Sequence, residues 1–103
     1  MRVIAMVYGP AIGIGLDICV ISDFCLAAQD ARFSAPLVRL GRTYYYTQIE
    51  RLTRLIGIGP AKEMLLTGRL IDSQRAKEIG LVNRVAGPDE LKSVTYSLAN
   101  EMA

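Results

Sequence analysis

Short apolar runs separated by turn residues dominate the first third of the chain. Between the first two runs, residues 16–22 are apolar on nearly all sides and carry Asp17 as their only charge, which indicates a short buried helix. Gly9-Pro10 marks a turn directly after the first run. The apolar runs themselves predict short strands: residues 3–7, 24–28 and 32–34.

The remaining two thirds of the chain predict mostly helices. Thr47 and Glu50 have the spacing of a capping box, which predicts a helix over about residues 48–56 that Gly57 ends. Proline at a first helical position and Asp-Ser at a cap mark two further helix starts. The other predicted elements are a helix from Pro60 to Gly68, a helix from Ser73 to Ile79, a strand over residues 81–85 and a last helix after residues 87–90.

The last predicted helix carries an apolar stripe, formed by Leu91, Val94, Leu98 and Met102. The sequence ends at Ala103, and no later element follows that could cover the stripe. We therefore expect something outside these residues to bury it.

Composition indicates one domain over residues 1–103. Half of the 103 residues are apolar, enough for one modest core. The net charge of +2 is spread along the chain without a basic face, so nucleic acid is not an expected partner. The opening apolar run faintly imitates a secretory signal, but Gly and Pro interrupt it and it is too short to span a membrane.

Two cysteines, Cys19 and Cys25, lie six residues apart in apolar surroundings, and the chain has no histidine to complete a zinc site. We expect both to be reduced, buried thiols and the protein to be cytoplasmic, with no metal.

Taken together, four stretches resemble the crotonase (enoyl-CoA hydratase/isomerase) superfamily. The first is similar to the family's strand, Gly-rich turn and helix start, and the last, with its Leu-Thr-Gly and Ala-Lys-Glu-Ile-Gly-Leu-Val segments, is especially characteristic. They follow the family's order along nearly the whole chain: residues 3–17, 22–33, 36–41 and 66–85.

The resemblance implies an α/β fold, a spiral of ββα units like those of ClpP and crotonase. Family members are more than twice this long, so residues 1–103 would form a single partial domain, the central and C-terminal part of the spiral. The implied function is an acyl-CoA-processing enzyme in which coenzyme A is part of the substrate and no separate cofactor is used. A homo-oligomer, a trimer or dimer of trimers, is implied as well, with no membrane partner. This piece alone is expected to be inactive.

The family chemistry stabilises a thioester enolate with backbone N–H groups, which a helix start can supply. By the motif, the donor falls at Ile14, between Gly13 and Gly15, and the two glycines would allow a tight turn and close approach of the substrate. Alternatively, these glycines only pack helix against strand.

Asp17 occupies the position where many hydratases of the family carry their first catalytic glutamate. One turn from Ile14, it would lie on the same side of the helix as the donor and serve as a general acid or base. The structural alternative is an acid that only complements the helix dipole.

Other positions depart from the family pattern. Leu37 replaces the second catalytic glutamate, which argues against simple hydration, and Tyr44 lies in a run of three tyrosines that replaces a glycine-rich segment. Leu37 and Tyr44 would line the substrate site. A tyrosine hydroxyl could replace the lost acid, but packing and lining of the acyl pocket is the favoured interpretation of the three rings. Arg39 and Arg42 could meet phosphates or be solvated.

Two other functions compete with this interpretation. A dinucleotide-binding fold would explain Gly13 and Gly15 after a strand, but Ile18 stands where the third glycine belongs. A non-catalytic remnant that acts as an oligomerisation or interaction module would explain Leu37 and the partial length.

Overall fold

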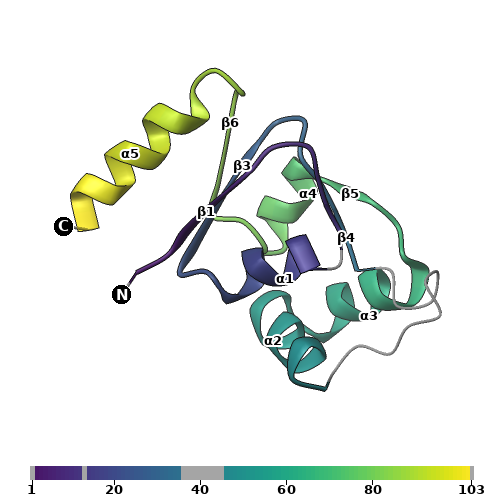
Figure 1. The fold of residues 1–103 in the computed structure, drawn as a ribbon. Helices are drawn as coiled ribbons and strands as arrows, with labels where there is room; N and C mark the ends of the chain where they lie inside the picture. Colours follow the sequence, from purple (N-terminus) through teal and green to yellow (C-terminus); the bar gives the residue numbers. More distant parts are fainter. Residues whose placement is uncertain (1, 13, 36–45, 103) are drawn as a thin grey trace.

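The computed structural model describes residues 2–12, 14–35 and 46–102, which form six strands and five helices (Figure 1). In chain order the elements are β1 (Ile4–Val7), β2 (Pro10–Ile12), α1 (Ile14–Ile21), β3 (Phe24–Ala28), β4 (Arg32–Ser34), α2 (Tyr46–Ile56), α3 (Ile58–Thr67), β5 (Ile71–Asp72), α4 (Ser73–Glu78), β6 (Arg84–Ala86) and α5 (Leu91–Met102).

The first four strands of the chain alternate between two small sheets. β1 pairs in parallel with β3, and after a bend in each strand the continuations β2 and β4 pair in parallel as well. The first bend is at Gly9, whose φ of 68° favours glycine, and Arg32 N donates to Gly9 O at 3.0 Å to hold the two bends together. Each strand–strand–helix unit forms one winding of a spiral, as the family resemblance implied. The strand β2 was not predicted, because only a backbone turn was expected after β1.

The next passage of the chain adds one strand to each sheet. β5 pairs antiparallel with β4, and β6 pairs in parallel with β3, which gives the orders β2-β4-β5 and β1-β3-β6. β5 was not predicted from the sequence. The strand predicted over residues 81–85 is observed as β6. It starts three residues later and ends one residue later than predicted.

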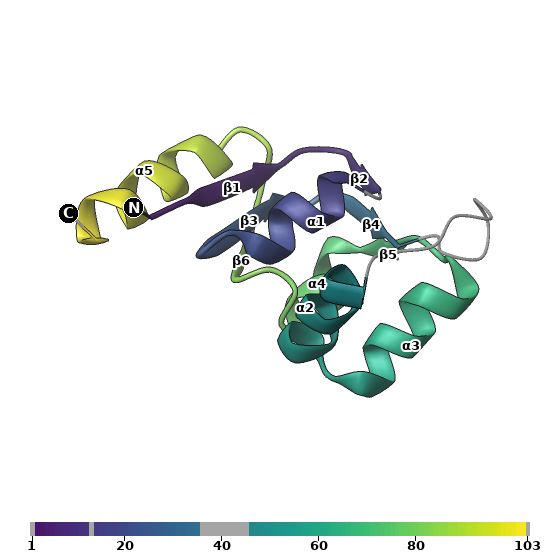
Figure 2. The ribbon, with the colours of Figure 1, turned by 60° about the horizontal axis from the view of Figure 1, so that its bottom comes forward.

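The sheet β1-β3-β6 is covered on both faces, and β3 shows this by strict alternation. Cys25 and Ala27 belong to the main core with α1 and α2, whereas Leu26 and Ala28 belong to a second cluster with α5. Figure 2 shows α5 alongside β1, on the side away from α2 and α3. A strand that is buried on both faces explains the continuous apolar run in the sequence.

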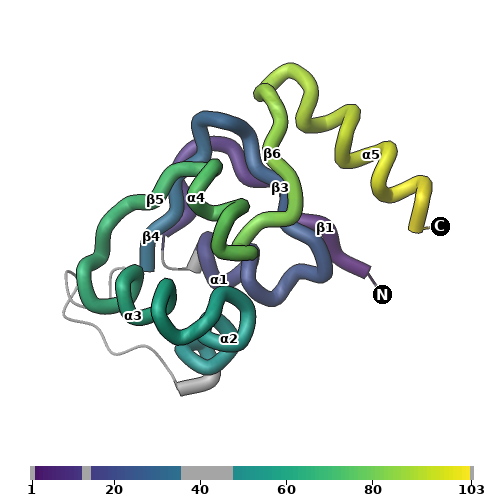
Figure 3. Tube along the Cα trace, turned by 180° about the vertical axis from the view of Figure 1, so that it is seen from behind, coloured from purple at the N-terminus to yellow at the C-terminus, as the bar shows by residue number. Residues whose placement is uncertain are grey.

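The apolar stripe of α5 is therefore not left uncovered, and the expectation that something outside the chain must bury it is wrong. Leu91 is fully buried and Leu98 is 6% exposed, because both lie on β1 and β3. Arg2 Nη1 donates to Met102 O at 2.7 Å, and the two ends of the chain lie side by side in Figures 1 and 3. The helix folds back onto a strand formed almost one hundred residues earlier, a pairing that periodicity does not reveal.

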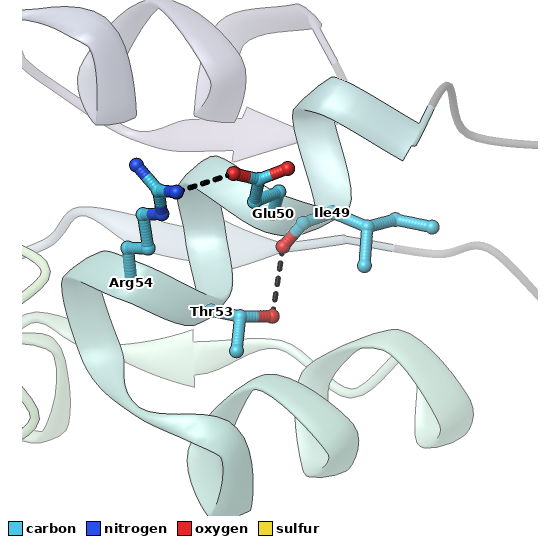
Figure 4. A network of polar contacts seen from close by, with 4 residues as sticks. All are labelled: Ile49, Glu50, Thr53 and Arg54. Atoms are coloured by element: carbon cyan, nitrogen blue, oxygen red, sulfur yellow. Dashed lines mark hydrogen bonds and ion pairs between the residues drawn. The ribbon is translucent and has the colours of Figure 1, made fainter.

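The helix α2 begins at Tyr46, about two residues before the predicted start, and the predicted capping box involves the Thr47 side chain, which lies outside the described part of the structure. Glu50 forms an ion pair with Arg54 one turn later, at 2.7 Å, and Thr53 Oγ1 donates to Ile49 O at 2.8 Å (Figure 4). An exposed pair at this spacing stabilises a helix by about 0.3–0.5 kcal/mol.

The other helix ends follow the sequence signals more closely. Gly68 ends α3 in the left-handed conformation, with its N–H donating to Met64 O at 3.1 Å. Asp72 caps α4, because its Oδ1 accepts from Arg75 N at 2.8 Å. Pro60 is the third residue of α3 rather than the first, since the helix starts at Ile58.

Cys19 and Cys25 form a disulfide, which contradicts the expected reduced thiols. A short turn joins α1 to β3 and folds the helix back against the strand, which brings the two Cα atoms to 5.7 Å, a normal distance for a disulfide. Because disulfides are rare in cytosolic proteins, the cysteines no longer argue for a cytoplasmic location.

Candidate functional site

The predicted oxyanion donor lies at the start of a helix. Ile14 is the first residue of α1, which follows directly after β2 and the Gly13 position. N–H groups in the first turn of a helix have no acceptor within the helix and point out along its axis, where they favour negative charge. Ile14 therefore lies where a helix start leaves backbone N–H groups without an acceptor inside the helix.

Asp17 lies one turn further into α1 and is half-buried. It lines a small cavity between α1 and α2 that is otherwise almost entirely apolar. The centre of a water-sized sphere can occupy only about 10 Å³ of this cavity. The cavity therefore has room for roughly one water molecule. Its described lining residues are Leu16, Asp17, Val20, Ala35, Gln48, Ile49, Leu52 and Leu65.

A second polar side chain faces Asp17 across this cavity. Gln48, in the first turn of α2, donates from Nε2 to Asp17 Oδ2 at 3.5 Å. From the sequence, Gln48 is predicted only as part of a helix, with no function of its own. A single glutamine carries no spacing signal, so only the packing of α1 on α2 brings it to the carboxylate.

Apolar contacts fix the positions of the two helices on either side of this polar pair. Leu16 is 3% exposed and Leu52 is 4% exposed, and both belong to the main core. Burying two leucine side chains stabilises the fold by about 1.5–3 kcal/mol each. The carboxylate and the amide are thus carried by rigid elements rather than by surface loops.

Gly15 lies on a different side of α1 from Asp17. It lines an open groove of about 220 Å³ beside β1 and β2, together with Ala11 and Ile18. A Cβ added at Gly15 would meet Ala11 Cβ at 3.8 Å, an ordinary contact, so close packing does not require glycine here. The structure thus brings Ile14 and Asp17 into one helical turn but places Gly15 toward a separate surface.

The other predicted site positions cannot be placed. Gly13, Leu37 and Tyr44 lie outside the described residues, as do Arg39 and Arg42. Within the described part, no three His, Cys, Asp or Glu side chains gather closely enough to hold a metal ion. None of the helices in residues 14–35 and 46–102 is long and apolar enough to cross a membrane.

Comparison with known proteins gives consistent matches along the whole chain. The family model for enoyl-CoA hydratase/isomerase matches residues 1–103. A short-chain-enoyl-CoA hydratase of Clostridium acetobutylicum is 41% identical over 100 residues, and a crotonyl-CoA hydratase of Syntrophomonas wolfei is 45% identical over 100 residues. In each case the alignment covers 97% of this chain but only 38% of the relative, so the chain spans about two fifths of their length.

Solved structures show the same fold. An enoyl-CoA hydratase/carnithine racemase from Magnetospirillum magneticum superposes with a TM-score of 0.93 at 31% identity, covering 98% of this chain and 38% of that one. An enoyl-CoA hydratase/isomerase from Pseudoalteromonas atlantica gives a TM-score of 0.93 at 32% identity, covering 98% and 41%. The spiral seen here is thus the crotonase fold, present in part.

Proposed function

Because the chain belongs to the enoyl-CoA hydratase/isomerase family, we propose that it contributes the enolate-stabilising half of an acyl-CoA-processing site. The observation that carries the proposal is the placement of Asp17, half-buried in an apolar cavity one turn from the first residue of α1. A carboxylate held beside apolar side chains, one turn from a helix start, is placed to act as a general acid or base there.

In the proposed step, the Asp17 carboxylate takes a hydrogen from the carbon next to the thioester carbonyl. The electron pair of the broken C–H bond forms a double bond to the carbonyl carbon, and the π electrons of the carbonyl group move to its oxygen, which gives the enolate. The N–H of Ile14 donates to that oxygen and stabilises its charge. Return of the proton to the carbon, or to another carbon of the chain, completes the reaction.

The reaction we favour within the family needs one carboxylate rather than two. The family's second catalytic glutamate is replaced by Leu37, and water addition in that scheme uses both acids. Isomerisation of a double bond or a related proton transfer requires only one base that removes and returns the proton. The relatives from Clostridium acetobutylicum and Syntrophomonas wolfei are named as hydratases, so their names describe water addition by those proteins.

A second function is favoured by the exposed apolar surface around β1 and β2. Met6, Ile12 and Ile18 are each between 44% and 53% exposed, and within the described residues β1 pairs on one edge only. Such a surface suits association with another protein chain or with copies of itself. The alternative proposal is therefore a non-catalytic module of the same fold that assembles through this surface.

Titration of the chain with crotonyl-CoA in a calorimeter separates these two functions. The enzymatic proposal predicts saturable binding, with weaker binding of free coenzyme A because the acyl thioester contributes contacts of its own. A non-catalytic module predicts no saturable heat with either compound. Absence of saturable binding by the correctly folded chain would contradict the enzymatic proposal.

A further inference from the structure

We propose that Gln48 is a positioning residue that orients the Asp17 carboxylate for proton transfer. This inference rests on the proposed function of Asp17 and goes beyond it by assigning a role to a residue of the neighbouring helix. The contact that carries it is the 3.5 Å hydrogen bond from Gln48 Nε2 to Asp17 Oδ2.

The apolar surroundings of this hydrogen bond determine its strength. The other described residues of the cavity wall are apolar, and Leu16 and Leu52 beside the pair are almost fully buried. A hydrogen bond to a carboxylate is stronger in such low-dielectric surroundings than in water. An amide donor also adds no charge of its own beside the carboxylate.

The direction of the bond determines which oxygen is held. Gln48 binds Oδ2, which restricts rotation of the Asp17 carboxyl group about its last side-chain bond. Aspartate is one methylene shorter than the glutamate of many relatives, so its oxygens can reach a substrate carbon from fewer positions. Fixing the orientation from α2 offsets this by keeping one carboxylate oxygen in a constant position.

A purely structural role would be a polar link between α1 and α2 with no effect on chemistry. The two roles differ in what a substitution changes. A positioning residue affects turnover only while Asp17 is a carboxylate, whereas a structural link affects folding whatever residue 17 is. A double-mutant cycle between residues 17 and 48 therefore separates them.

The experiment measures exchange of the α-hydrogens of butyryl-CoA with D2O, with kcat and KM determined for four forms of the full-length protein that contains this chain, because the piece alone is expected to be inactive. These are the unchanged protein, Asp17→Asn, Gln48→Met and the double variant. Methionine keeps the length of the glutamine side chain and lacks the donor. Gln74→Met is the matched control, because Gln74 is exposed on α4 and outside the cavity.

We expect Gln48→Met to lower kcat about tenfold with KM within about twofold, the loss typical of one hydrogen bond to a charged group. In the Asp17→Asn background the same substitution should change nothing further. Gln74→Met should match the unchanged protein. Unaltered kcat in Gln48→Met, or an equal loss in both backgrounds, would overturn the role of Gln48.

The same data report separately on the proposed function. If Asp17→Asn exchanges as fast as the unchanged full-length protein, or if the unchanged full-length protein shows no exchange, the proposed function itself fails and the assignment of Gln48 fails with it. If Asp17→Asn is slow and Gln48→Met is normal, only the inference about Gln48 fails.

Discussion

At the scale of single residues, Asp17 and Gln48 form a polar pair in the small cavity between α1 and α2. The family motif marks Asp17 as a candidate acid, and the structure places it in an apolar cavity between two helices. Gln48 could not be predicted, because nothing in the spacing of residues 17 and 48 links an amide to a carboxylate thirty-one positions away. Motifs identify residues that share a local segment, whereas contacts between segments depend on how the helices pack.

The cysteines illustrate the same difference. Cys19 and Cys25 were interpreted as separate buried thiols, and both are indeed 2% exposed. Their pairing depends on the turn that folds α1 against β3, which an apolar pattern does not specify. A bridge over so short a loop is expected to contribute roughly 2 kcal/mol to stability.

Alkylation before reduction tests the bridge. The chain is unfolded in denaturant with iodoacetamide and no reductant, and its intact mass is measured. We expect no carbamidomethyl groups in this sample and two in a sample reduced beforehand, because disulfide sulfur does not react with iodoacetamide. Two groups in the unreduced sample would show that the cysteines are thiols.

At the scale of elements, the strands and the ends of helices were predicted better than their partners. Residues 24–28 and 32–34 form β3 and β4 as expected, and Gly68 ends α3 through its left-handed conformation. β5 was missed because two residues are too few to show an alternating pattern. The stripe on α5 was recognised, but the element that covers it was not, because periodicity identifies a buried face without identifying what lies against it.

The burial of α5 can be tested with a matched pair of substitutions. Leu91→Ala removes a fully buried side chain between α5 and the sheet, so we expect a loss of about 2–5 kcal/mol in the free energy of unfolding. Leu66→Ala makes the same change at a side chain that is 61% exposed on α3, and should cost less than about 1 kcal/mol. Urea denaturation measures both values. Equal losses would mean that the α5 stripe is not packed as described.

At the scale of the whole molecule, the chain leaves part of its apolar surface open. The surface around β1 and β2 carries Met6, Tyr8 and Ile12, each close to half exposed, while the chain spans only 38% of the length of the relatives in the comparison. The sequence predicted an uncovered apolar face on the last helix, whereas the structure buries that face and leaves other apolar side chains exposed. These lie at the edge of the first strands rather than on the last helix.

This surface leads to a prediction about association. We expect the apparent mass of the chain in sedimentation velocity to rise with concentration, because an unpaired strand edge with apolar neighbours favours pairing between chains. Met6→Lys should reduce the association by placing a charge on that edge, and Leu66→Lys, far from it in the sequence, should not. A concentration-independent monomer would rule out this surface as an interface between copies.

The central claim is that Asp17 moves the proton that creates a thioester enolate. Its most direct test uses the full-length protein that contains this chain and measures the rate at which butyryl-CoA exchanges its α-hydrogens with D2O. Asp17→Asn is compared with the unchanged protein and with Asp30→Asn. Asp30 is an exposed turn residue outside the cavity, so its substitution makes the same chemical change elsewhere. We predict that Asp17→Asn slows exchange by about 10²–10⁴-fold while binding of butyryl-CoA is retained, and that Asp30→Asn has no effect. Equal exchange rates in all three forms would contradict the claim.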